Sequence, residues 1–268
     1  MNPLKDHEAV KEMLRLMEEN DRQEQAAEFA RLIDAVDNMS QQYAKLTNEL
    51  TEVKERLSEA SRLRHPLHDM LSKTVRAVET KADDAFVRLC SVRNRIISCA
   101  ETAVADFKRM GVSALDQAVA TLRVGDLLTA VGEKISAALD STETSIQKLE
   151  TMGRELRSAG AHMKNAGRAA GGKEVQPVDG GEAGRIQSAV LAPLRGVHSV
   201  LTQFSRTNGK ALTAVERLED AADRNRGKRE KSSVRHRLEK KPPALPAPAK
   251  KFREAERLTG KIPASSLP

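Results

Sequence analysis

The feature that most constrains the fold of this chain is a heptad repeat of apolar residues between Phe29 and Ala60. One series recurs every seven residues from Phe29 to Leu57, and a second series runs three positions later from Leu32 to Ala60. This spacing, kept for five heptads, gathers the apolar side chains along one face of a long helix. It predicts that this face packs against another helix.

A second heptad series follows Pro66, with apolar residues from Val75 to Ala103 and from Val78 to Cys99. Proline lacks a backbone N–H donor and restricts the residue before it, so the first helix should end or kink there. Two long seams joined by the short segment 65–68 predict an antiparallel, coiled-coil-like hairpin over residues 21–110. In that pairing Tyr43 should lie near Val92. The predicted seam consists of Phe29, Leu32, Val36, Met39, Tyr43, Leu46, Leu50, Val53, Leu57, Val75, Val78, Ala82, Ala85, Leu89, Val92 and Ile96.

The remaining sequence is also helical in pattern, and no stretch shows the alternation expected of a strand. A short helix is expected in residues 1–20, a helical segment in 111–172, a flexible Gly-rich linker in 173–184 and C-terminal helices in 185–223. Pro193 and Asn208-Gly209 should kink or split the last of these. The predicted fold is therefore all-α, an elongated bundle built on the hairpin, with a disordered, Pro-containing basic tail over residues 224–268.

Charge is distributed unevenly along the chain. The whole chain carries a formal charge of +7, but residues 224–268 hold 14 Lys+Arg and 4 Asp+Glu, which leaves the body at −3. Such a tail can attract nucleic acid, an anionic membrane surface or an acidic protein, or can simply be solvated. Phe252 is its only aromatic residue, so base stacking and sequence-specific recognition are not expected. The candidate polyanion-binding residues are Arg224, Arg226, Lys228, Arg229, Lys231, Arg235, Arg237, Lys240 and Lys241.

Motifs that would indicate catalysis or a cofactor are weak. The segment Gly167–Glu174 approaches a phosphate-binding loop, but Glu174 stands where a Ser or Thr should meet Mg²⁺, and the segment follows a helix. His65, His68 and Asp69 would need another ligand to form a zinc site. Cys90 and Cys99 fall on opposite faces of one helix and are read as small apolar positions. We therefore expect no catalytic residues, no cofactor and no metal.

Three short blocks resemble an uncharacterised helical family carried by bacterial conjugative and integrative elements. They are His65-Pro66-Leu67 through Val75-Arg76-Ala77-Val78-Glu79, Gly111-Val112-Ser113-Ala114-Leu115-Asp116, and Ala159-Gly160-Ala161-His162-Met163-Lys164-Asn165-Ala166-Gly167-Arg168. The resemblance follows the order of elements over roughly residues 1 to 225. It implies a bacterial mobile-element setting and brings no catalytic residues.

Two functional hypotheses follow. The first is a non-enzymatic helical scaffold or accessory protein that binds an unidentified protein partner. The alternative is an accessory protein that binds nucleic acid without sequence preference through the basic tail. The sequence shows no transmembrane segment, no apolar leader and no disulfide framework, so the expected location is the cytoplasm. Formation of homo-oligomers is left open.

Overall fold

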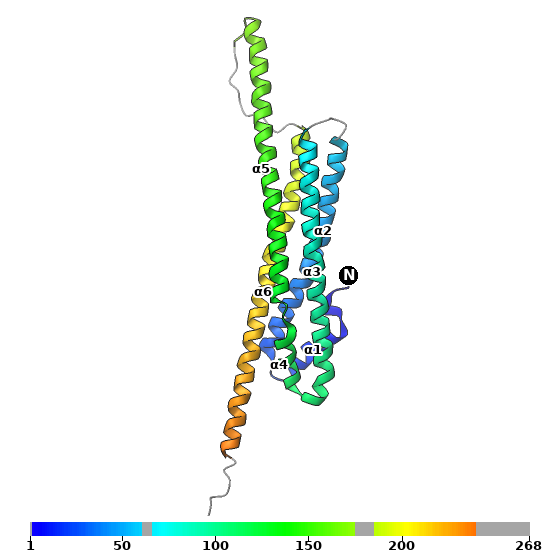
Figure 1. The fold of residues 1–268 in the computed structure, drawn as a ribbon, viewed down its shortest axis with the longest axis vertical. Coiled ribbons are helices and arrows are strands. Elements are labelled where there is room, and N and C mark those ends of the chain that lie inside the picture. Colours follow the sequence, from blue (N-terminus) through cyan, green and yellow to red (C-terminus); the bar gives the residue numbers. More distant parts are fainter. Residues whose placement is uncertain (1, 61–65, 175–184, 240–268) are drawn as a thin grey trace, which may run out of the picture. The chain divides into compact units, whose positions relative to one another are not determined.

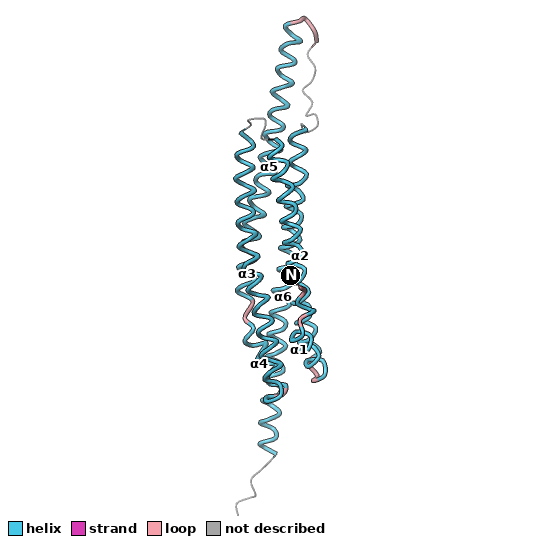
Figure 2. The backbone as a smooth tube through the Cα atoms, turned by 90° about the vertical axis from the view of Figure 1, so that its right-hand side faces the viewer, coloured by secondary structure: helices cyan, strands magenta, loops and turns pink. Residues whose placement is uncertain are grey.

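The computed structural model describes residues 2–60, 66–174 and 185–239, and over these residues the protein is all-α, as predicted. Figures 1 and 2 show that the described chain consists of helices and short connections, without a strand. In chain order the elements are the 3-10 helix η1 (Leu4–Asp6), α1 (Glu8–Glu19), α2 (Gln23–Ala60), α3 (Pro66–Met110), α4 (Val112–Leu122), α5 (Gly125–Ala170) and α6 (Arg185–Glu239).

Helices α2 and α3 lie side by side and antiparallel: residues later in α2 contact residues earlier in α3. The cross-links are ion pairs of Asp37 with Arg93 and of Lys54 with Glu79, and a hydrogen bond from Tyr43 Oη to Asp83. Proline opens α3, where its missing N–H would be unpaired in any case. Gly111, with φ of +57°, follows the last residue of α3.

The Tyr43 ring stacks on Phe86, with ring centroids 3.9 Å apart. Its ring partner therefore lies six positions before Val92, the neighbour expected from the heptads. Tyr43 is half-buried and Phe86 follows the buried Ala85, so the two rings meet at the flank of the seam. At the flank the carbons of the ring can pack while the hydroxyl donates to the exposed Asp83, which suits an amphipathic side chain.

Helices α4 and α5 together run antiparallel along α3. The links are Cys99 Sγ to Ala118 O, Arg95 Nε to Leu122 O, Lys134 Nζ to Asp84, Lys81 Nζ to Ala137 O, and Ser145 Oγ to Thr74. The helical segment expected over 111–172 is interrupted at Arg123, which is left-handed with φ of 41°. The Arg95 guanidinium donates to the Leu122 carbonyl at 2.6 Å and so satisfies an acceptor that the end of α4 leaves free.

Helix α6 completes the arrangement by lying antiparallel to both α5 and α2. Arg195 pairs with Glu150 and Asn208 Nδ2 donates to Leu128 O on α5, while Gln42 Nε2 of α2 donates to Thr207 Oγ1. Helices α2, α3, α5 and α6 therefore form an up-down-up-down four-helix bundle.

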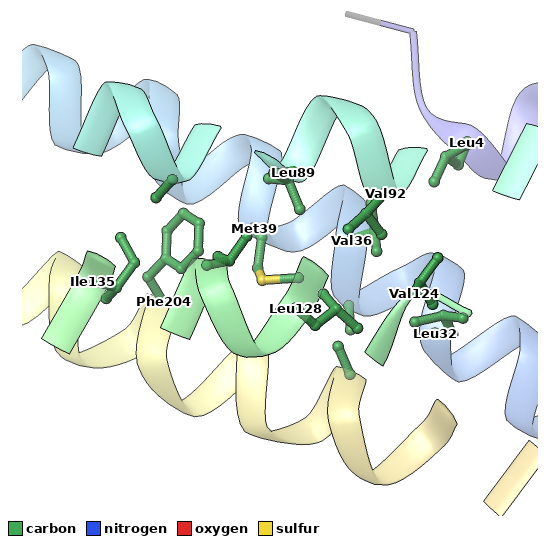
Figure 3. Packing of buried hydrophobic residues seen from close by; sticks show 14 of the residues in the cluster. Leu4, Leu32, Val36, Met39, Leu89, Val92, Val124, Leu128, Ile135 and Phe204 are labelled. Carbon is green, nitrogen blue, oxygen red and sulfur yellow. The ribbon is translucent and has the colours of Figure 1, made fainter. Parts of the chain in front are cut away.

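The core of this bundle is shared by all four helices. Figure 3 shows Met39, Leu89, Ile135 and Phe204, one from each helix, gathered in one apolar cluster. Apart from the half-buried Tyr43, every residue of the predicted seam is buried. The two heptad arms are not each other's only partners, however, because α5 and α6 carry apolar stripes of the same period. A four-helix core buries a wider face of each helix than a two-helix seam does.

Helix α6 is longer than the sequence pattern suggested. It is one helix through Pro193 and Asn208-Gly209, and it continues past Arg224 to Glu239. The end of the apolar period did not end the helix, since Arg, Lys and Glu are good helix formers and Arg226 pairs with Asp223 one turn earlier. The chain divides into two compact units, Met1–Arg226 and Gly227–Pro268. The rest of the predicted tail, 240–268, and most of the linker, 175–184, lie outside the described residues.

A pair of glycine substitutions tests the packing of α6 on α5. A Cβ at Gly132 would lie 2.8 Å from Nδ2 of the buried Asn208, whereas a Cβ at Gly209 would meet no atom within 4 Å. Gly132→Ala should displace the amide from Leu128 O and lower the free energy of unfolding by about 1 kcal/mol after the helix-propensity gain. Gly209→Ala should raise it by about 0.5–1 kcal/mol. Urea denaturation measures both, and shifts of the same sign would contradict the packing.

Candidate functional site

The first cluster of buried charge is centred on Asp37 of α2 and ties the N-terminal segment to the bundle. Its carboxylate accepts hydrogen bonds from Leu4 N at 2.7 Å and Lys5 N at 3.3 Å, which places it at the N-terminus of η1. Arg93 of α3 pairs with the same carboxylate at 3.3 Å and also donates to Asn2 O. The side chains of Asp37 and Arg93 are only 10% and 12% exposed. Such a satisfied ion pair links elements rather than offering a reactive group.

The second cluster is centred on Asp116 of α4, whose side chain is 2% exposed. Its Oδ1 accepts from Arg22 Nε at 3.3 Å and from the buried Gln25 Nε2 at 3.1 Å. Arg22 directly precedes α2 and Gln25 lies in its first turn, so Asp116 joins the α1–α2 connection to α4. A buried carboxylate is costly unless donors surround it, and here the donors come from a segment more than ninety positions earlier in the chain.

A groove between α2 and α6 is lined in part by charged side chains. Its volume is about 770 Å³, and its lining comprises Glu28, Arg31, Asp34, Ala35, Asn38, Arg206, Thr207, Gly209, Lys210, Thr213, Ala214 and Arg217. Glu28 is nearly buried and pairs with Arg31 and, at 4.0 Å, with Arg217. The groove thus mixes both signs of charge, and neither Cys nor His lines it.

The segment that approaches a phosphate-binding loop forms the C-terminal end of α5. Gly171 N donates to Gly167 O at 3.2 Å, Lys173 N donates to Arg168 O at 2.9 Å, and Gly172 has φ of +68°. These bonds make a helix C-terminal cap. The backbone N–H groups that would hold a phosphate are engaged with helix carbonyls instead.

The histidine turn is described only in part. His65 lies outside the described residues, while His68 Nδ1 lies 3.4 Å from Asp69 Oδ1 on an exposed turn of α3. Over the described ranges, no group of three or more His, Cys, Asp or Glu side chains is placed to hold a metal ion.

The two cysteines sit in different surroundings on α3. Burial raises the pKa of the Cys99 thiol to about 12, although Arg95 acts in the opposite direction, and the thiol donates a hydrogen bond to Ala118 O. Partial burial also raises the pKa of the half-buried Cys90 thiol. Because the thiolate is the reactive form, both environments suppress nucleophilic chemistry.

The candidate polyanion-binding residues divide into three groups. Arg224 pairs with Glu24 of α2 and Arg226 with Asp223, so both have acidic partners. Lys228, Arg229, Lys231, Arg235 and Arg237 belong to the last turns of α6. Lys240 and Lys241 lie outside the described residues.

The arrangement defines an all-α protein whose buried charges hold helices together around an antiparallel four-helix bundle. No described helix has the length and apolar character required to cross a membrane. The chain belongs to a protein family of unknown function, DUF6674, whose model matches residues 6–258. No curated protein and no solved structure matches this chain.

The Asp37 cluster can be tested by mutation. Asp37→Ala should lower the free energy of unfolding by about 2–3 kcal/mol, because it leaves the Arg93 guanidinium and two backbone N–H groups without their acceptor. Asp34→Ala, at an exposed position one turn away, should change it by less than about 0.5 kcal/mol. Urea denaturation gives both values, and limited trypsin digestion should show faster cleavage near Lys5 in the first variant only.

Thiol labelling tests the cysteine environments. With a pKa of about 12, only about one Cys99 thiol in 10⁴ is ionised at pH 8. Iodoacetamide should therefore modify Cys90 at least about tenfold faster than Cys99 in the folded protein. Peptide mass spectrometry measures the two rates, and in denaturant they should converge. Equal rates in the folded state would contradict the burial of Cys99.

Proposed function

We propose that this protein is a non-enzymatic helical scaffold or accessory protein that acts by binding a protein partner. The observation that carries the proposal is the use of its buried charges: Asp37 and Asp116 both receive donors from other elements of the same chain. Charged groups used in this way hold a framework in shape, whereas catalytic groups need access to a substrate. A bundle fixed by such links can present long helix faces in a constant arrangement.

The proposed setting is a bacterial mobile element, with the protein in the cytoplasm. The support is the resemblance of the blocks around Pro66, Gly111 and Gly160 to a helical family carried by conjugative and integrative elements. In that setting an accessory protein would contribute contacts to a larger assembly.

Capture of partners from the native host tests the proposal. The full chain, tagged and chemically cross-linked in cells, should retain one protein at constant stoichiometry after nuclease digestion and after washing with about 0.5 M salt, which screens exposed charge pairs. A tagged, unrelated four-helix bundle serves as the control. Recovery of nucleic acid without any specific protein would contradict this function.

A second candidate function, non-specific binding of nucleic acid, is favoured by the continuation of α6. The helix carries a run of bases from Lys228 to Arg237 beyond the two arginines that have acidic partners. Bases held on a helix can neutralise several phosphates of one duplex, and the released counterions make such binding strongly dependent on salt.

Charge neutralisation in the full chain tests this second function. If about five bases meet phosphates, the slope of log affinity for duplex DNA against log salt should be near −4 to −5. Replacing Lys228, Arg229, Lys231, Arg235 and Arg237 by Gln should bring the slope close to zero. A matched control replaces five bases of the body, Lys45, Lys73, Arg76, Lys108 and Lys148, by Gln and should keep the slope. Equal slopes for the two variants would exclude the α6 bases as the binding site.

A further inference from the structure

The apolar seam of α5 continues beyond the part of the helix that the bundle buries. Ile135, Thr142 and Leu149 are buried at intervals of seven, and the same series then reaches Met163, which is 76% exposed. The companion series passes from buried Ala138 and Ser145 to half-buried Met152 and then to exposed Ala159 and Ala166. One helix face is thus core in its first part and solvent-exposed in its second.

The change occurs where α3 begins. Ser145 hydrogen-bonds Thr74 at 2.9 Å. Pro66 lies eight residues before Thr74, so in this antiparallel pair it is level with Gly153, eight residues after Ser145. Figures 1 and 2 show α5 running on past the ends of α2 and α3. We call residues Arg154–Ala170 the α5 arm; a helix of this length is about 25 Å long.

Three glycines mark one line along this part of α5. Gly153, Gly160 and Gly167 are spaced by seven residues, and a Cβ at Gly160 or Gly167 would meet no atom within 4 Å. Each glycine costs about 1 kcal/mol relative to alanine inside a helix. Among the described residues, no atom lies where a side chain at Gly160 or Gly167 would begin, whereas a second backbone lying close to the arm would need the space that these two glycines leave open.

The charges of the arm lie beside the glycine line. At 100° per residue, Gly160 and Gly167 are about 40–60° from Met163 around the helix, and Lys164 and Arg168 follow at about 100–140° on the same side. Glu155 lies on the other side, and no further acid occurs before Glu174. A helix lying along the glycine line would therefore meet apolar side chains on one flank and bases on the other.

We propose that the α5 arm is the docking site for an amphipathic helix of a partner protein, with its apolar stripe against Met163 and acidic side chains against the basic flank. This inference rests on the proposed scaffold function and names its site. Charge complementarity selects such a partner over a second copy of this chain, because Arg154, Arg157, Lys164 and Arg168 against Glu155 give each arm a net positive charge.

A designed peptide provides the probe. It is a fluorescent amphipathic helix of about 20 residues, long enough to be helical when bound, with Leu at heptad positions a and d and Glu at e and g. Fluorescence anisotropy with the full chain should show binding that Met163→Asp weakens at least about tenfold. Gly160→Leu should weaken it as much without lowering helix content. The same peptide with Lys in place of Glu should bind at least about tenfold more weakly.

The matched control is Val87→Asp. Val87 of α3 and Met163 are the exposed large apolar side chains of the described residues, so both variants exchange an exposed apolar group for a carboxylate. Val87→Asp should leave peptide binding unchanged. Equal weakening by the two variants, or equal binding of the Glu and Lys peptides, would overturn the proposal.

Two further measurements separate the arm from its alternatives. Sedimentation should show that the wild-type chain and Met163→Asp have the same mass; a wild-type dimer that Met163→Asp dissociates would assign the arm to a second copy and overturn the proposal. A native partner captured equally well by wild type and Met163→Asp would leave the scaffold function standing and remove the arm as its site.

Discussion

The burial of apolar helix faces that repeat every seven residues is the interaction on which the rest of this structure depends. Each of α2, α3, α5 and α6 offers one such face, and none of the four could bury it alone. Phe204, Met39, Leu89 and Ile135 meet in a core that draws on all four helices. With one tyrosine and five phenylalanines in the whole chain, this core depends mainly on aliphatic side chains. Close helix packing over a long distance replaces the thick aromatic core of a globular domain.

Polar links then fix the smaller elements to that core. The carboxylate of Asp37 holds η1 where α2 and α3 lie together, and that of Asp116 holds the start of α2 against α4. Arg95 donates to the carbonyl of Leu122, the last residue of α4, and α5 then continues along the same side of α3. Short elements bury little apolar area, so a few charge-assisted hydrogen bonds contribute a large share of what keeps them in place.

The sequence predicts those features that depend on neighbours in the chain. Heptad spacing identified the buried face of α2 and α3, and Pro66 marked the break between these two helices. It could not identify contacts whose partners are far apart: the donors to Asp37 and Asp116 include residues 56 and 94 positions away, and no local pattern relates them. The end of α6 was placed too early because apolar period was taken as a sign of helix, although charged residues sustain helices well. The ring contact of Tyr43 could not be predicted from the heptad spacing either. Tyr43 occupies a heptad position, but Phe86, on which its ring stacks, does not belong to the predicted seam.

Asn208 has a consequence for how the helices slide along one another. It stands in the series Leu194, Leu201, Asn208, Val215 and Ala222, all of which are buried, so the apolar faces alone would fit almost as well after a shift of one heptad. Such a slip would bring an aliphatic side chain to the space beside Gly132 and leave the Asn208 amide buried without the Leu128 carbonyl. An unpaired buried amide costs about 1–3 kcal/mol. Asn208 therefore fixes the register of α6 against α5, because other registers would leave its amide without a partner.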